Sequence, residues 1–294
     1  MSKHQSPIER QLEALPPLPP TVTRVIELTA NPESSANDLV KALLPDQTMC
    51  VTILKFANSV LYGRPKKVSS LETAVMVLGF TEIQGIVMAK AAVTSFCKLF
   101  EENRQMLDQF WNHAFNCGLA ARIISENMNL KSGQFFIAGL LHDLGKLAMA
   151  LTYKENYMAE DWLLNFTTSQ ELAHEKEQFS ISHDEIGARL LERWKFPDNL
   201  VSALRHHHAA APAESSSDYP LVIQVADFLS HLLNLAEPPD ERQLKTLFEQ
   251  NLPAFESRWQ QQQLPWQDIT LEWWFTWLQV DAKHGSEILD VLAT

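Results

Sequence analysis

Residues 135–151 read FFIAGLLHDLGKLAMAL, an apolar segment interrupted by the adjacent polar residues His142 and Asp143. The length and composition of this segment predict one buried helix. An ionised carboxylate in such a helix costs free energy unless it is paired or bound to a cation, and a neutral histidine beside it supplies a nitrogen ligand for a metal ion. Taken alone, the two residues are better explained as a hydrogen-bonded pair in the core, because a metal site needs further ligands.

Helical periodicity continues on both sides of this segment, from about residue 21 to residue 235. Ser182 and Glu185 have the spacing of a capping box, which places His183 in the first turn of a helix. Nine glycines are few for an all-β or nucleotide-binding α/β fold, and no repeat with a period of roughly 20–50 residues is present. The sequence therefore predicts an all-α fold, with LPPLPP at residues 15–20 lying extended over it.

The C-terminal part of the chain is rich in tryptophan. Five of the eight tryptophans lie between residues 240 and 294, namely Trp259, Trp266, Trp273, Trp274 and Trp277. Large aromatic side chains favour burial, so we expect a helical tail that docks on the core by its aromatic face. The alternative is an exposed surface that binds a partner.

The charge and the cysteines limit the classes of function. The formal net charge is -12, which disfavours direct binding to nucleic acid and to anionic membranes. The three cysteines are far apart and odd in number, which fits a reducing compartment, and we expect a cytoplasmic protein. The N-terminal residues lack the apolar core of a signal peptide, and no uninterrupted apolar run has the length of a membrane span.

Ligand-type residues recur along the second half of the chain. Six of the ten histidines are the candidates, and all six lie in one block of about 100 residues: His113, His142, His183, His206, His207 and His208. These residues and Asp227 lie on or at the ends of separate predicted helices. Each has a simpler explanation when taken singly, since a histidine at a helix C-terminus interacts favourably with the helix dipole. Five helices that each carry one or two such residues are better explained by a common metal site.

This order of residues resembles that of a known superfamily. His113, His142–Asp143, His183, His207–His208 and Asp227 follow the ligand order of the HD superfamily of metal-dependent phosphohydrolases, and HDLGK at 142–146 is similar to its HD-x-G-K segment. Several further segments resemble the HDOD family, the "HD-related output domain". They are LPPLPP at 15–20, LKFANSVLYG at 54–63, and residues 70–79, 187–191 and 194–197. The resemblance covers roughly residues 15–235. It implies an HDOD helical subdomain over 1–105, an HD-like metal-site subdomain over 106–235 and a tail over 236–294.

The resemblance implies a metal site and two alternative functions. One or two divalent ions, of iron, manganese, nickel or zinc, would be held by His113, His142, Asp143, His183, His207, His208 and Asp227. In the first alternative the chain is a signal-transduction regulator that acts by binding a signalling protein or a small phosphorylated ligand. In the second it is a phosphohydrolase or phosphodiesterase on a nucleotide-like substrate, with Asp143 and Lys146 as catalytic residues and the ions activating phosphate and water.

Departures from related enzymes favour the regulator. The HD-GYP phosphodiesterases, which cut cyclic di-GMP, follow their His–His pair with Glu and then Gly-Tyr-Pro, whereas residues 209–212 here read AAAP. Some of these enzymes also use a Glu for a third metal ion, at the position that Gln109 occupies here. Lys146 either binds phosphate or pairs with Asp143, and the sequence does not separate the two roles. We recognise no receiver or sensor segment, so we expect the input to come from a partner or a ligand.

Overall fold

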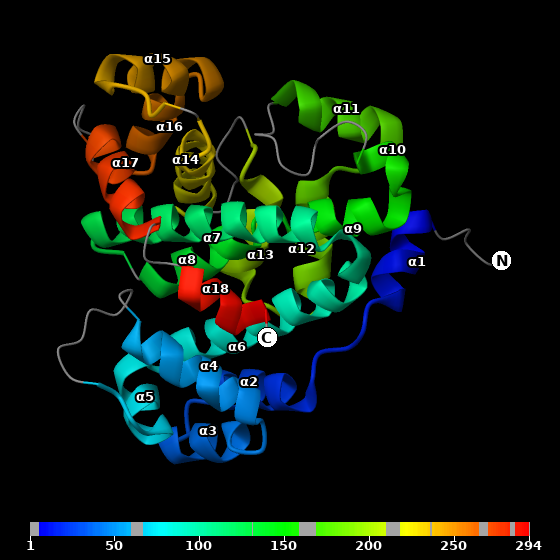
Figure 1. The fold of residues 1–294 in the computed structure, drawn as a ribbon, viewed down its shortest axis with the longest axis vertical. Helices are drawn as coiled ribbons and strands as arrows, with labels where there is room; N and C mark the ends of the chain where they lie inside the picture. The colour runs from blue at the N-terminus through cyan, green and yellow to red at the C-terminus, as the bar shows by residue number, and fades with distance from the viewer. Residues whose placement is uncertain are drawn as a thin grey trace. The chain divides into compact units, whose positions relative to one another are not determined.

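Figure 1 shows the computed structural model of the chain, which describes residues 6–59, 67–130, 132–158, 169–209, 218–235, 237–264, 270–282 and 286–293. Within these ranges the regular structure is helical and contains no strand, which confirms the predicted all-α fold. Contacts divide the chain into two compact units: residues 16–108 with 283–294, and residues 1–15 with 109–282. The division into three parts stays a prediction. Contacts place the first 15 residues in the second unit and residues 283–294 in the first unit, which differs from that division at both ends of the chain.

The first unit is a bundle of helices with short turns between them. Serine caps start α3 and α5, and Gly79, with a φ of 81°, separates α5 from α6. A positive φ of this kind favours glycine, so the turn residue is well matched to its conformation. The helices are α2 (Pro20–Ala30), α3 (Ala36–Leu43), α4 (Gln47–Asn58), α5 (Leu71–Leu78), α6 (Phe80–Leu99) and α18 (Ser286–Ala293), with a 3-10 turn at Glu101–Asn103.

The last helix, α18, belongs to this unit and contacts α4 and α6. Lys90 Nζ on α6 donates to the Val291 carbonyl at 3.0 Å, and Thr94 Oγ1 donates to the Leu292 carbonyl at 3.4 Å. The last carbonyls of a helix have no partner within the helix, so these side chains satisfy them. Polar side chains on α6 therefore hold the end of the chain in the first unit, whereas residues 236–282 of the expected tail belong to the second.

The second unit contains the apolar segment 135–151 with His142 and Asp143. Its core is formed by α9 and α13 packed on α12, and by α8 and α13 packed on α14. The helices are α1 (Pro7–Ala14), α7 (Arg104–Asn127, which starts in the first unit), α8 (Ser132–Leu141), α9 (Leu144–Tyr153), α10 (Glu155–Met158), α11 (Ser169–Phe179), α12 (His183–Arg193), α13 (Asp198–His206), α14 (Tyr219–Leu232), α15 (Glu241–Asn251), α16 (Phe255–Gln261) and α17 (Thr270–Asp281).

The prediction of a single helix over residues 135–151 is wrong. The chain turns at His142 and Asp143, so that α8 ends at Leu141 and α9 begins at Leu144. Adjacent residues of one helix do not face each other, whereas in this turn His142 Nε2 and Asp143 Oδ2 lie 3.2 Å apart. The apolar residues on both sides are buried equally, so hydrophobic periodicity gave no sign of the turn.

One helix start also differs from its prediction. His183 does lie in the first turn of α12, but the Ser182 side chain makes no capping bond to the backbone. It donates instead to the Asp184 carboxylate, while Glu185 accepts from Arg189 and Arg205. The predicted capping box is therefore absent, because both of its side chains have other partners.

The helices α15 to α17 form a separate layer of this unit. Trp259 and Trp274 are buried in it, while Trp273 and Trp277 are 44% and 47% exposed; Trp266 lies outside the described residues. The aromatic docking expected for the tail thus holds for two tryptophans, and a partner surface remains a prediction for the two exposed ones. Arg258 on α16 donates to the Ala209 carbonyl at 2.7 Å, directly after the two adjacent histidines.

One stretch of the described chain is long and apolar enough to cross a membrane by length and composition. It runs from Gln134 to Tyr153 and is the α8–α9 segment itself. Within the structure 89% of it is buried, which is the behaviour of a core segment.

Candidate metal centre

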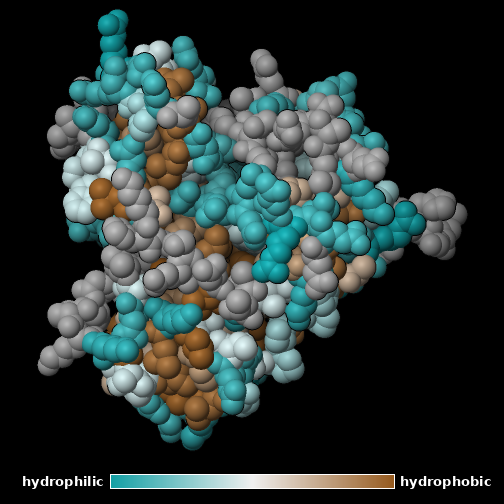
Figure 2. Space-filling model, in the orientation of Figure 1, coloured by the Kyte–Doolittle hydropathy of each residue, from teal (hydrophilic) through white to brown (hydrophobic). Residues whose placement is uncertain are grey.

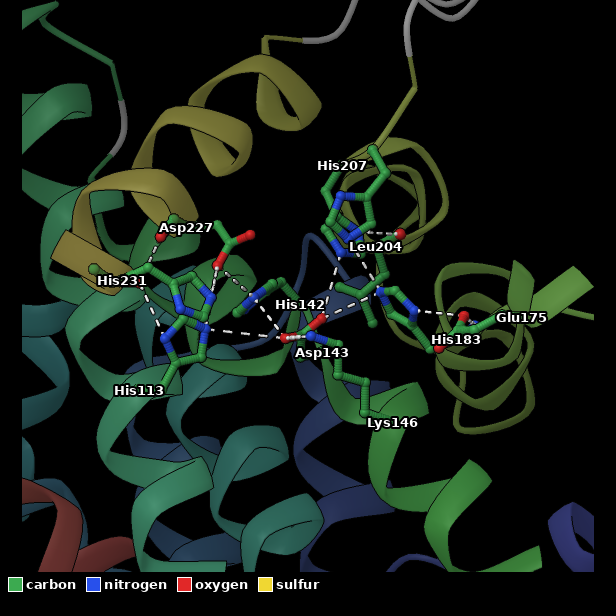
Figure 3. A network of polar contacts seen from close by, with 12 residues as sticks. His113, His142, Asp143, Lys146, Glu175, His183, Leu204, His207, Asp227 and His231 are labelled. Carbon is green, nitrogen blue, oxygen red and sulfur yellow. Dashed lines mark hydrogen bonds and ion pairs between the residues drawn. The ribbon is translucent and has the colours of Figure 1, made fainter. Parts of the chain in front are cut away.

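The side chains predicted as metal ligands come together in the second unit (Figure 3). They reach one region from α7, the α8–α9 turn, the start of α12, the end of α13 and α14. Their ligand atoms form two groups, and within each group all atoms lie within 4.8 Å of one another. The first group is Asp143, His183, His207 and His208, and the second is His113, His142 and Asp227. All are buried except His208, which is partly exposed.

Asp143 lies between the two groups. Its Oδ1 is 3.3 Å from His183 Nε2 and 3.6 Å from His207 Nε2. Its Oδ2 is 3.2 Å from His142 Nε2 and 3.9 Å from His113 Nε2. One carboxylate oxygen therefore faces each group, which is the arrangement that a carboxylate bridging two ions requires.

Asp227 gathers the second group. Its Oδ1 lies 3.2 Å from His113 Nε2 and 3.4 Å from His142 Nε2. A third nitrogen, His231 Nε2, is also 3.2 Å away, and the His231 ring lies 4.1 Å from the His113 ring. Bonds of roughly 2.0–2.1 Å to a tetrahedral ion place neighbouring ligand atoms roughly 3.3 Å apart. The spacings to Asp227 Oδ1 therefore match the edges of a metal coordination shell.

Backbone carbonyls fix the ring orientation of two ligands. His142 Nδ1 donates to the Gly139 carbonyl at 2.7 Å, and His207 Nδ1 donates to the Leu204 carbonyl at 2.6 Å. A carbonyl only accepts, so both Nδ1 atoms carry the proton and, in the neutral ring, Nε2 has a lone pair. That lone pair points at carboxylate oxygen, which is repulsive unless a cation lies between them. Metal-binding histidines characteristically have this kind of outer hydrogen bond.

The inward-facing atoms test whether this site suits a metal ion. Five of them are buried and have no hydrogen-bond partner in the described part of the chain: His113 Nε2, His142 Nε2, Asp143 Oδ1, His207 Nε2 and Asp227 Oδ1. Buried polar atoms without partners are rare and costly. Mixed imidazole and carboxylate ligands suit first-row divalent ions. The residues present therefore fit a divalent metal ion.

The charge states in the centre agree with this interpretation. Burial opposes charge on His142, but the Asp143 carboxylate outweighs burial and raises the pKa of His142 well above its usual value. Burial likewise opposes charge on Asp143, yet His142 and Lys146 hold the pKa of that carboxyl well below its usual range. A proton on His142 Nε2 then occupies the position that a metal ion would take.

Side chains orient two further ligands. Glu175, buried on α11, accepts through Oε2 from both the backbone N and the Nδ1 of His183, each at 2.8 Å. Its other oxygen accepts from Tyr157 Oη at 2.8 Å. Burial alone would lower the pKa of His183, but Glu175 raises it to about 9. In the second group, the Ser230 hydroxyl lies 3.2 Å from His113 Nδ1.

Lys146 lies beneath the centre on α9. It is 1% exposed, and its Nζ is 2.8 Å from Asp143 Oδ2. Burial would lower the pKa of Lys146, but the Asp143 carboxylate outweighs burial and raises it. Of the two roles weighed from the sequence, this geometry favours pairing with Asp143 over an open phosphate contact.

Sequence reasoning found the seven ligands but missed two other members of this site. His231 stands four residues after Asp227 on the same helix, so the shared helix face was a usable signal. Glu175 gave no such signal, because a turn with Ser180 at a φ of 62° separates it from His183. His206, counted among the clustered histidines, belongs to neither ligand group.

Comparison with known proteins agrees with the fold. A curated protein from Treponema pallidum (strain Nichols), named only as uncharacterized, is 25% identical over 235 residues, or 76% of this chain. The chain spans 43% of the length of that relative.

Solved structures from three bacteria are similar along nearly the whole chain. An HDOD domain protein of unknown function from Geobacter sulfurreducens has a TM-score of 0.69 at 21% identity, covering 97% of this chain and 99% of its own. A protein from Shewanella amazonensis SB2B, provisionally named a metal-dependent phosphohydrolase, has a TM-score of 0.62 at 22% identity, covering 96% and 95%. One from Marinobacter aquaeolei VT8, provisionally named a signal transduction protein, has a TM-score of 0.64 at 22% identity, covering 99% and 62%. At these identities the likeness is one of fold.

The family assignment rests on a match over most of the chain. The family model described as the HDOD domain matches residues 15–210, which are 196 of the 294 residues. This range includes six of the seven predicted ligands, from His113 to His208, and stops before Asp227. The protein belongs to the HDOD domain family.

Proposed function

We propose that this protein is an HDOD signal-transduction module that binds one or two divalent ions and acts by binding a signalling protein or a small phosphorylated ligand. The observation that carries the metal centre is the convergence of buried histidine nitrogens on Asp143 and Asp227, with no hydrogen-bond partner for five of the inward atoms. A bound ion would supply Lewis-acid polarisation of a phosphate. The chain's own residues hold the ring orientations and keep the ligand atoms out of water.

The regulatory role is supported by what surrounds the centre. Lys146 is buried and paired with Asp143, so this cation is poorly placed to reach a substrate phosphate from solvent. The residues that follow His208 lack the substrate motif of the related phosphodiesterases. Partly exposed His208, whose Nε2 is 3.1 Å from His183 Nε2, is the ligand nearest to solvent and a contact point for a bound partner or ligand.

A second candidate, a metal-dependent phosphohydrolase, is favoured by one observation. Asp143 presents one oxygen to each ligand group, and two ions sharing a carboxylate are common in enzymes that act on phosphate esters. In that case Asp143 would position both ions, and Lys146 would keep the carboxylate ionised.

Two measurements test the proposal. Elemental analysis of protein purified without oxygen or chelator, followed by metal titration, should show one or two ions per chain. A phosphoesterase screen with manganese, iron and magnesium, run beside the Asp143→Ala variant, should show no turnover that depends on Asp143. Protein that neither contains nor takes up metal would refute the metal centre, and turnover abolished by Asp143→Ala would replace the regulator with the phosphohydrolase.

Replacing Glu175 by glutamine is expected to lower metal affinity by roughly 10–100-fold, the usual effect of losing an outer partner of a metal-binding histidine. The substitution keeps the size of the side chain but removes the charge that orients His183. Metal titration by calorimetry measures the effect. Glu177→Gln, an exposed change on the same helix, is the control and should bind as the wild type does. Equal affinity in both variants would show that Glu175 has no part in the centre.

A further inference from the structure

The C-terminal helices of the second unit line a pocket of about 360 Å³ that is partly open to solvent. Its apolar lining comes from all three helices and the segment between them: Leu244, Phe248, Leu252, Phe255 and Leu271. Figure 2 shows hydrophobic side chains exposed between hydrophilic flanks in this region, over α15 to α17. A pocket of this size could hold on the order of ten waters at roughly 30 Å³ each, so it has room for a small ligand.

The rim of the cavity is strongly acidic. Four of its residues are glutamates and one is a lysine, which gives a formal charge of -3 (four negative, one positive) at the opening: Glu241, Glu249, Glu256, Glu272 and Lys245. All five lie on the exposed side of their helices. An apolar interior with charge of one sign at its mouth is complementary to a ligand with an apolar body and a charge of the opposite sign.

We propose that this cavity binds a small organic cation, an amine or ammonium group carried on an aryl or alkyl body. The apolar body would lie against Phe248 and Phe255, whose ring centres are 5.4 Å apart at right-angle packing, and the cationic head would lie among the rim glutamates. The volume lies within the range of small-ligand pockets, roughly 300–1,000 Å³. A protein partner would need an interface of roughly 800 Å² on this side, far more than the mouth of a pocket of this volume offers.

This site is separate from the metal centre and does not depend on it. None of the residues that line the cavity is a predicted metal ligand. Helix α16 contributes Phe255 to the cavity but no ligand to the metal centre; its Arg258 donates to the Ala209 carbonyl, directly after His208.

The test uses three probes with the same apolar body: phenylbutylamine, phenylbutanol and phenylbutyrate. Calorimetry or ligand-observed NMR on the full chain should show that the amine binds roughly fivefold or more tightly than the alcohol, because several exposed carboxylates each contribute modestly. The carboxylate probe should bind more weakly than the alcohol. Equal affinities for all three probes, preference for the alcohol or carboxylate, or no binding of the amine would overturn the proposal.

Variants locate the binding. Glu249→Gln with Glu272→Gln should reduce the preference for the amine toward that for the alcohol, while Glu33→Gln with Glu237→Gln, both outside the cavity, should leave it unchanged. Ser257→Trp, at an exposed helical position on the lining, should fill the cavity and abolish binding, and Ser257→Ala should retain it. Binding that survives Ser257→Trp in a folded protein would place the probe elsewhere and refute the proposal.

Discussion

Asp143→Ala is expected to lose metal binding, with a fall in affinity greater than the roughly 10–100-fold that removal of an outer partner costs. Asp143 belongs to the first ligand group, with Oδ1 near His183 and His207, while its Oδ2 faces His142 of the second group. Removing this carboxylate therefore takes a ligand from the first group and a neighbouring charge from the second. Elemental analysis and metal titration of the purified variant measure the loss.

Folding must be separated from metal binding in this experiment. Removing one partner of a buried ion pair costs about 3–5 kcal/mol, and Asp143 pairs with buried Lys146. Asp143→Asn keeps the shape of the side chain, so a folded Asn variant without metal isolates the role of the charge. The matched control is Asp184→Asn, because Asp184 is also buried but belongs to neither ligand group. If Asp143→Ala retained the full metal content, the centre as described would be wrong.

Gly145→Ala is expected to destabilise the second unit by about 1–3 kcal/mol or more and to weaken metal binding. A Cβ built at Gly145 would lie 1.9 Å from the His183 carbonyl oxygen and 2.8 Å from the Gly187 nitrogen. Both are backbone atoms, so α9 and α12 must move apart to admit a methyl group. His183 is the first residue of α12, and the shift would move it away from Asp143.

Gly187→Ala is the matched control for this prediction. There a new Cβ would meet a flexible Leu204 methyl at 3.2 Å and the Gly145 nitrogen at 3.3 Å, so the neighbours need to move much less than at Gly145. Both substitutions replace a helical glycine by alanine, so the difference between them reports the closer contact at Gly145. Urea denaturation followed by circular dichroism gives the stabilities, and metal titration gives the affinities. A Gly145→Ala protein as stable as Gly187→Ala would contradict the close approach of the two helices.

The sequence predicts the helical class of the fold and the position of most helices. It does not predict every turn between helices, nor which helices pack together. Helical spacing marks apolar faces, and these residues are the ones that the structure buries. The turn at His142 and Asp143 escaped prediction because both flanking helices are buried on all sides, which hides the end of one and the start of the next. The place of α18 escaped because the interactions that hold it, from Lys90 and Thr94, connect residues about 200 positions apart.

The candidate site shows the same division. The ligand order was readable because histidine and aspartate are conspicuous in apolar helices, and the structure brings all seven residues together. The residues that orient those ligands are less conspicuous. Glu175 lies on a helix with many charged residues, where one more glutamate does not stand out. Its role depends on contact with His183, which the sequence does not encode in any fixed spacing.

The outer hydrogen bonds of the four buried histidines fall into two kinds. In one kind the partner is a main-chain atom, which a substitution cannot remove, and in the other it is a side chain, which a substitution can remove. His142 and His207 are held by main-chain carbonyls, so no substitution at Gly139 or Leu204 removes the acceptor itself. His183 is held by the Glu175 side chain, and the His113 ring contacts the Ser230 hydroxyl, so single base changes can retune either one. The orientation of His142 and His207 is thus robust to mutation, whereas that of His183 and His113 can change. Among related chains, we expect differences in metal preference to coincide with substitutions at the Glu175 and Ser230 positions.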